Sequence, residues 1–164
     1  MKKLIPLVLV LVCCSVAVNG QTRTGKDSST KTPKSESARR RAVILPGTTP
    51  NGLFSPAIVA GDLVFTSGQI GVDPKTSQIV PGGIEQETLQ VFRNLTAVLE
   101  AAGSDLDHIL KATVFLADMD DYNFMNELYR SRFKGDPPAR TTVQVARLPR
   151  NARIEIEAIA IVKR

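Results

Sequence analysis

Apolar and polar residues alternate with a regular period along most of the chain after residue 56, and this pattern predicts the secondary structure. Two short apolar stretches joined by Gly61 and Asp62 predict a hairpin over residues 57–67. Apolar residues at three- and four-residue spacing then predict a helix over 84–102, which Gly103 ends.

The second half of the chain predicts three strands and one further helix. Residues 109–117 alternate strictly and predict a strand that has one face made of Leu110, Ala112, Val114 and Leu116. The acidic residues within 118–121 favour the start of a helix, which the pattern extends to about Phe133. Alternation resumes at Arg140 and again over 153–161, which predicts the last two strands.

Strands interleaved with two helices predict an α+β fold in which both helices cover one face of a mixed β-sheet. The opposite face is not uniformly polar, because Phe115, Ile159 and Ile161 lie on it among Thr, Gln, Arg and Glu. A partly apolar, exposed face of this kind is typical of an interface between copies of a chain. We therefore expect an oligomer with sites lined by the polar residues of that face.

Residues 1–20 have the composition of a secretory signal peptide. Two lysines precede an apolar run over 4–18, which is short for a transmembrane helix. An uncleaved membrane anchor is one alternative, and a lipoprotein with a lipid on Cys13 or Cys14 is another. Cleavage after Ala17 or Gly20 removes both cysteines, and with them disulfides, thiol nucleophiles and cysteine metal ligands. The segment predicts an exported protein, either periplasmic or secreted.

Residues 21–41 are predicted to form a disordered basic linker, because they are rich in Ser, Thr, Lys and Arg without apolar periodicity. The predicted domain, 42–164, holds twelve Lys/Arg and fourteen Asp/Glu, so its net charge is −2. The basic charge of the chain therefore lies outside the domain. Nucleic acid is not an expected partner, since the domain has no basic-aromatic stripe. The linker can still contact an anionic membrane surface.

Arg140 and Glu155 are the candidate functional residues that the chemistry suggests. Arg140 follows two stiff prolines, and a guanidinium binds a carboxylate through two parallel hydrogen bonds. A structural ion pair is the alternative. Glu155 and Glu157 share one face of the last strand, where a carboxylate can hold or activate a water. The alternative for these two is an ion pair with Arg147, Arg150 or Arg153.

The pairing of the last two strands decides how close these candidates come. In a simple hairpin Gln144 lies opposite Glu155, and Arg140 then lies near Ile159, about 13 Å from Glu155 along the strands. Either a substrate and a water span this gap or the strands pair differently. The only histidine, His108, lies in a turn without the partners that a catalytic triad or a zinc site needs. We expect no metal and no cofactor.

Four segments occur in the order and spacing of the RidA family, the reactive-intermediate (enamine and imine) deaminases. They are FTSGQIGVDPKTSQIVPGG, NLTAVLEAAGSDLDHILKATVFLADMDDY, PPARTTVQVARLP and IEIEAIAIV. The resemblance covers about residues 44–164. It implies a chorismate-mutase-like α+β domain that forms a homotrimer with a site in each cleft between subunits.

The resemblance also implies roles for individual residues. Arg140 is similar to the arginine that binds the substrate carboxylate, and Glu155 is similar to the acid that positions the attacking water. Ser67 and Gly68 match residues at a strand end that line the cleft, and Asn126 matches an asparagine of the second helix. Hydrolysis of 2-imino acids or their enamine tautomers to 2-keto acids and ammonia is the implied reaction.

Two positions depart from the family pattern. Phe54 stands where active members usually have Tyr, so one hydroxyl is missing, and Thr142 stands where many members have Cys. Both belong to the substrate-binding residues that the resemblance implies. The departure at Phe54 keeps a second interpretation open, in which the chain is a non-enzymatic trimer that binds small carboxylates outside the cytoplasm.

Overall fold

The computed structural model describes residues 40–49 and 52–164, all within the compact unit Pro33–Arg164. The predicted signal peptide, 1–20, and most of the predicted linker lie outside the described residues. The last two linker residues do not match the prediction, because Arg40 and Arg41 pair with Ala60 and Val59 in the first strand of the sheet. The domain therefore begins at least two residues earlier than its apolar pattern indicates.

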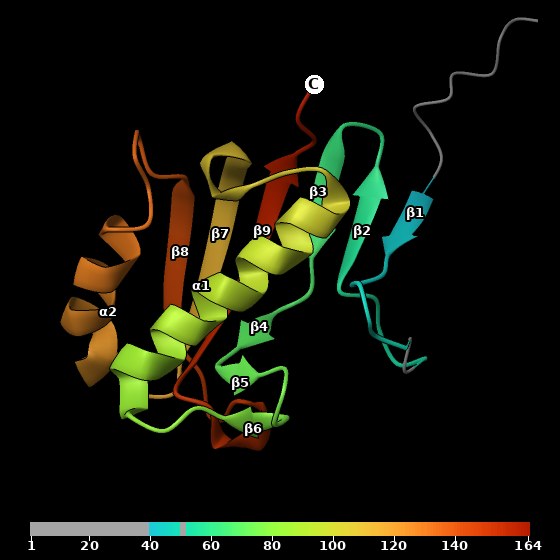
Figure 1. The fold of residues 1–164 in the computed structure, drawn as a ribbon. Helices are drawn as coiled ribbons and strands as arrows, with labels where there is room; N and C mark the ends of the chain where they lie inside the picture. The colour runs from blue at the N-terminus through green and yellow to red at the C-terminus, as the bar shows by residue number, and fades with distance from the viewer. Residues whose placement is uncertain (1–39, 50–51) are drawn as a thin grey trace, which may run out of the picture. The chain divides into compact units, whose positions relative to one another are not determined.

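Seven strands form one sheet (Figure 1). From one edge to the other they are β1 (Arg40–Val43), β2 (Ala57–Ala60), β3 (Leu63–Thr66), β9 (Ile154–Ile161), β7 (Ile109–Leu116) and β8 (Ala139–Gln144), while β4 (Gln69–Ile70) pairs with another part of β9. All neighbours are antiparallel except β7 and β8, which are parallel. The sheet is therefore mixed, as predicted. A separate hairpin joins β5 (Val72–Asp73) to β6 (Gln78–Ile79).

Two helices cover one face of this sheet, which confirms the α+β prediction. In Figure 1 the long helix α1 (Gly83–Ala102) crosses the sheet, and the short helix α2 (Tyr122–Arg130) lies beside β8. Gly103 ends α1 in the left-handed conformation with φ 85°, a region that glycine enters without steric cost. The second helix ends at Arg130, before the predicted Phe133, and three 3₁₀ turns complete the domain: Leu106–His108, Met119–Asp121 and Pro149–Asn151.

The core lies between the helices and the sheet. At the start of β7, the residues that face this core differ from those that strict alternation predicts. Ala112, Val114 and Leu116 are buried as the alternation predicts, but Leu110 is 48% exposed. The pairing of β7 with β9 shifts between Ile109 and Lys111. This irregularity turns Ile109 inward in place of Leu110, because one extra residue in a strand reverses the side-chain direction.

Of the two alternatives for the last two strands, the structure shows that they pair differently from a simple hairpin, because β7 lies between β8 and β9. Arg140 pairs with Ala112 of β7, and Ala112 pairs with Ala158 of β9. The residues at these three positions share the helix-covered face of the sheet. The other face, here called the open face, carries Glu155, Phe115 and the alternate residues of β8.

A buried acid joins α1 to the sheet. Glu87 of α1 is 4% exposed and accepts a hydrogen bond of 2.8 Å from the Arg153 backbone N–H. The Arg153 side chain donates two hydrogen bonds of 2.9 Å to the Asp121 carboxylate, which ties the start of β9 to the start of α2. Burial raises the pKa of Glu87 above its ordinary value of 4.5, although Arg153 opposes the shift.

This raised pKa predicts a pH-dependent stability. The folded state holds the Glu87 proton more tightly than the unfolded state, so the free energy of unfolding falls as pH rises from about 4.5 through the folded-state pKa. Urea unfolding over this range should show a shallower fall in Glu87→Gln than in the original protein. The exposed Glu85 of α1 provides the control, Glu85→Gln. Equal slopes in the Glu87→Gln variant and the original protein would contradict the interpretation.

Candidate active site

Arg140 lies where β8 begins, on the helix-covered face of the sheet. Its Nη2 donates a hydrogen bond of 2.6 Å to Oδ1 of Asn126 on α2. A cleft of about 340 Å³ surrounds this pair and is lined by Asn126, Tyr129, Arg130, Pro137, Pro138 and Arg140. The two prolines, which fix the approach of the chain, therefore form one wall of the cleft.

The Arg140 cleft is suited to a small anion. Among the described residues no carboxylate pairs with Arg140, so the structural ion pair fails as an explanation within one chain. With Nη2 on Asn126, the remaining N–H groups of the guanidinium can take a carboxylate through two hydrogen bonds. Thr142 follows two residues later on the same face, and its buried hydroxyl has no hydrogen-bond partner in the described part of the chain.

Glu155 lies on the open face, against the backbone of Gly68. A Cβ built at Gly68 would overlap Oε1 of Glu155 and lie 2.6 Å from its Cδ, so a side chain at this position would displace the carboxylate from its present place. The described chain offers neither Glu155 nor Glu157 a hydrogen bond or an ion pair. Arg153, one of the predicted partners, pairs instead with Asp121.

The environment of Glu155 favours its protonated form. Burial raises the pKa of Glu155 above the ordinary 4.5, and the negative charge of Glu157 raises it further. A carboxyl group whose pKa moves toward neutral pH is suited to exchange protons with a bound molecule. Such a shift at a partly exposed, unpaired acid is typical of a functional site.

Ser67 and Gly68 follow the end of β3, and Ser67 is hydrogen-bonded to the loop that carries Phe54. The Ser67 hydroxyl donates a hydrogen bond of 2.7 Å to the backbone carbonyl of Ser55, and the Ser67 N–H donates one of 2.9 Å to that of Pro56. These bonds attach the Phe54 loop to the strand end. Phe54 is 61% exposed.

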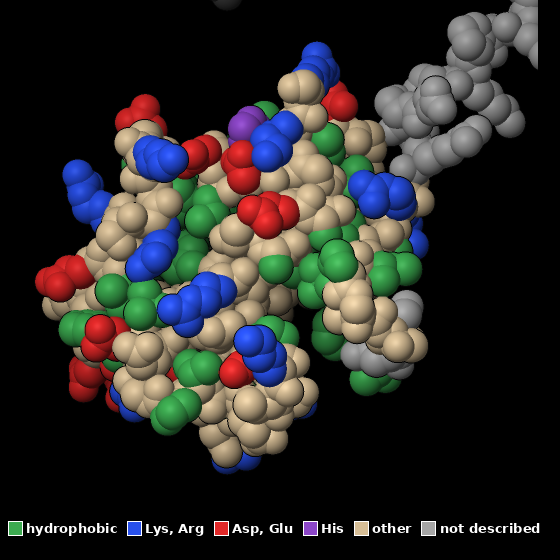
Figure 2. All heavy atoms as spheres, in the orientation of Figure 1, with side chains coloured by type: hydrophobic (Ala, Val, Ile, Leu, Met, Phe, Trp, Pro, Cys, Tyr) green, Lys and Arg blue, Asp and Glu red, His purple; other side chains and the backbone are tan. Residues whose placement is uncertain are grey.

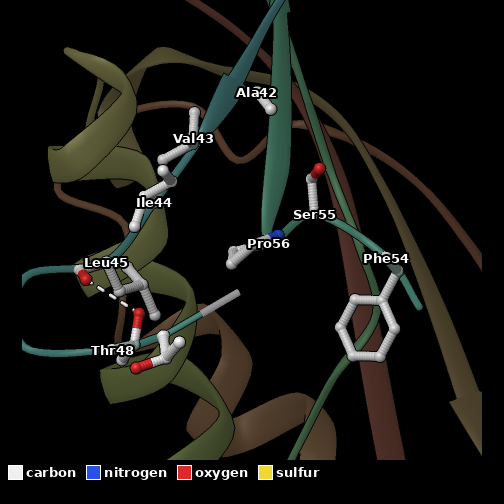
Figure 3. Close-up of a pocket in the computed structure, with 9 residues that line it drawn as sticks. Ala42, Val43, Ile44, Leu45, Thr48, Phe54, Ser55 and Pro56 are labelled. Atoms are coloured by element: carbon white, nitrogen blue, oxygen red, sulfur yellow. Dashed lines mark hydrogen bonds between the residues drawn. The ribbon is translucent and has the colours of Figure 1, made fainter. Parts of the chain in front are cut away.

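A pocket of about 260 Å³ opens next to Phe54. Figure 3 shows Val43, Leu45 and Thr48 on one side of it and the Phe54 ring on the opposite side, with Pro56 between them. Most of the side chains that line the pocket are apolar. A short aliphatic group fits such walls better than a charged one.

The predicted site residues thus form two groups. We call Arg140, Asn126 and Thr142 the arginine cluster, and Glu155, Gly68, Ser67 and Phe54 the glutamate cluster. Glu155 pairs with Phe115 of β7, which pairs with Val143 of β8. Two strand spacings and three residues along β8 then separate the Cα atoms of Glu155 and Arg140 by roughly 14 Å. The two side chains also point to opposite faces of the sheet.

Tyr129 of α2 is a neighbour of Arg140 that the sequence pattern did not indicate. In the structure its ring lies 4.5 Å from the Arg140 guanidinium carbon. The available signal was its spacing of three residues from Asn126, which places both on one side of α2.

His108 is hydrogen-bonded to Asp105 at 2.6 Å. Within 40–49 and 52–164, no group of three His, Cys, Asp or Glu residues is arranged to hold a metal ion, and no helix has the length and apolar character of a membrane span.

Comparisons with known proteins agree with this fold. The family described as Endoribonuclease L-PSP matches residues 47–162. The 2-iminobutanoate/2-iminopropanoate deaminase of Rattus norvegicus is 47% identical over 110 residues, which cover 67% of this chain and 80% of the rat protein. RidA from an Antarctic Psychrobacter is 35% identical, with a TM-score of 0.70 over 74% of this chain and 99% of that structure. Escherichia coli TdcF with bound serine is 36% identical, with a TM-score of 0.67 over 75% and 99%.

The effect of Glu157 on Glu155 can be measured directly. Removing the charge in Glu157→Gln should lower the pKa of Glu155, because one of the two causes of its shift is lost. Carbon-13 NMR titration of the Glu155 carboxyl measures this change, and Glu127→Gln on α2 serves as the control. An unchanged titration in Glu157→Gln would mean that the two carboxylates do not interact.

Proposed function

The chain belongs to the RidA (YjgF, endoribonuclease L-PSP) family, and on this premise we propose that it hydrolyses 2-imino acids and their enamine tautomers to 2-keto acids and ammonia. Relatives named 2-iminobutanoate/2-iminopropanoate deaminase occur in rat, mouse and human. The observation that carries the proposal is the unpaired Arg140 in its cleft, held by Asn126. A 2-imino acid offers this guanidinium a carboxylate next to the reacting carbon.

Arg140 would fix the substrate by its carboxylate and so orient the adjacent C=N bond. Glu155 would hold the attacking water and take one of its protons as the oxygen bonds to the imine carbon. The same carboxyl group then returns the proton to the nitrogen. This gives a carbinolamine, and its hydroxyl proton then moves through Glu155 to the nitrogen. As the carbonyl forms, the C–N bond breaks and ammonia leaves with both protons of the water. Water supplies the oxygen of the keto acid, and no oxidant or reductant is consumed.

The apolar pocket beside Phe54 supports a substrate with a short aliphatic side chain. Its walls come from β1 and the loop that precedes β2, next to the glutamate cluster. The rat relative is named for butanoate and propanoate, which carry such side chains. Small aliphatic 2-imino acids are therefore the substrates that we propose.

We propose a homotrimer in which each site joins two copies. One chain cannot place both clusters on one substrate, because Arg140 and Glu155 point to opposite faces of its sheet. The open face supports assembly, since Phe65 is 41% exposed and Val143 38% exposed on it. In such an assembly Arg140 of one copy would meet Glu155 of the next.

The missing Phe54 hydroxyl favours a second candidate, a trimer that binds small carboxylates without turnover. The arginine cluster alone would be sufficient for this role. We do not propose RNA cleavage, although the family description names an endoribonuclease. The domain has no net charge, because Arg40 and Arg41 of β1 offset the charge of −2 on residues 42–164, and Figure 2 shows acidic and basic side chains interspersed on the visible face.

Export remains part of the proposal and rests on the composition of residues 1–20. Intact-mass analysis of the protein recovered from outside the cytoplasm should find an N-terminus after Ala17 or Gly20. A lipid-sized mass increase on Cys13 or Cys14 would support the lipoprotein alternative. An intact N-terminus found only in the cytoplasm would contradict export.

The deaminase proposal predicts faster release of 2-oxobutanoate when an amino-acid oxidase generates 2-iminobutanoate in the assay. Arg140→Ala should lower kcat/KM by about 100-fold or more, because a charge-assisted, two-point contact is lost. Arg130→Ala, which removes a different cleft arginine, is the matched control. Phe54→Tyr tests whether a hydroxyl at that position raises the rate.

Calorimetry separates the two candidates. The non-enzymatic carboxylate binder would be favoured if 2-oxobutanoate binds in an Arg140-dependent way while the protein does not speed the formation of 2-oxobutanoate from 2-iminobutanoate. Acceleration that survives Arg140→Ala would overturn the role assigned to this arginine.

A further inference from the structure

The Arg140 guanidinium lies over aromatic rings of α2. Its central carbon is 4.5 Å from the centroid of the Tyr129 ring and 5.8 Å from that of Tyr122. Both distances fall within the range in which a cation is attracted to the face of a ring. Together with the hydrogen bond to Asn126, these contacts hold the long Arg140 side chain in one orientation.

Tyr129 is a rigid support for this cation. It is 4% exposed, and its ring contacts Phe92 at 5.6 Å edge-on and Phe133 at 5.0 Å. Aromatic packing of this kind fixes the plane of the Tyr129 ring. The ring therefore offers Arg140 a surface that does not move with the exposed rim of the cleft.

The Tyr129 hydroxyl does not account for the choice of residue. Its oxygen is buried without a hydrogen-bond partner in the described part of the chain, which is an unfavourable arrangement. Burial raises the pKa of Tyr129 to about 12, so the hydroxyl keeps its proton at physiological pH. The part of Tyr129 that meets Arg140 is therefore the face of its ring.

We propose that Tyr129 is a positioning residue whose ring orients Arg140 for the substrate carboxylate before the substrate arrives. This inference rests on the proposed function, in which Arg140 binds that carboxylate. An arginine side chain loses considerable rotational freedom when it is fixed by a ligand. If the Tyr129 ring has already fixed it, binding is tighter because less freedom is lost on contact.

The test uses side chains that keep the size of the ring and change its electrostatics. Tyr129→Phe retains a negative ring face and removes the unpaired hydroxyl. Tyr129→pentafluorophenylalanine has nearly the same shape, but its ring face is positive and repels a cation. Phe133→pentafluorophenylalanine is the matched control, because Phe133 packs against Tyr129, whereas the rings under Arg140 in the described part of the chain are those of Tyr122 and Tyr129.

Calorimetry with 2-oxobutanoate on the full-length protein should show Kd within about twofold of the original for Tyr129→Phe. Tyr129→pentafluorophenylalanine should weaken binding about fivefold or more, which lies within the strength of a cation–π contact. Its KM for 2-iminobutanoate should rise by a similar factor, with a smaller change in kcat. The Phe133 control should stay within about twofold.

An NMR order parameter for the Arg140 Nε–H group gives a readout that needs no substrate. It should fall in Tyr129→pentafluorophenylalanine and stay high in Tyr129→Phe. An order parameter and a Kd that both stay unchanged would overturn the positioning role, as would an equal loss in the Phe133 control. Loss of order in a protein that never binds 2-oxobutanoate would support positioning and reject the carboxylate role of Arg140.

Discussion

Side chains along a β-strand alternate between the two faces of a sheet, and this constraint governs the candidate site. Arg140 is in register with the buried Ala112, whereas Glu155 is in register with Phe115 on the open face. No rotamer change can bring the two side chains together through the sheet. A reaction that needs both groups must therefore draw them from different copies of the chain. For this reason we propose that the activity depends on the assembly of the oligomer.

The two clusters are built by different means. The arginine cluster depends on α2, which supplies the amide of Asn126 and the ring of Tyr129 to a cation on an edge strand. The glutamate cluster depends on close backbone approach, because Gly68 leaves the space that the Glu155 carboxylate fills. One cluster holds a permanent charge in fixed orientation, and the other keeps an acid partly buried, where its pKa is raised. Together they match the two demands of imine hydrolysis, a fixed carboxylate and a proton carrier.

Periodicity alone was sufficient to predict α1, α2, β7 and β9, because their apolar residues face one continuous core. In β8 it indicated a strand only, since the apolar Val143 lies on the open face and Arg140 and Thr142 face the helices. It failed where long-range pairing decides the structure. Nothing local indicates that β7 separates β8 from β9, or that the register shift near Ile109 exposes Leu110. The chemistry of Arg140 and Glu155 could be read from residue type and resemblance, but their opposite faces depend on that pairing. Tyr129 was missed for a related reason, since its partner Arg140 lies eleven residues further along the chain and only the fold brings them into contact.

Mixed oligomers of Arg140→Ala and Glu155→Gln test the central claim most directly. Each variant alone should be inactive in 2-imino acid hydrolysis, because every site lacks one group. When equal amounts are unfolded and refolded together, random assembly should restore about a quarter of the sites, those that join an intact Arg140 to an intact Glu155 of a neighbouring copy. Recovery of about a quarter of the original activity is the predicted result. A mixture that stays as inactive as its components would contradict a site shared between copies.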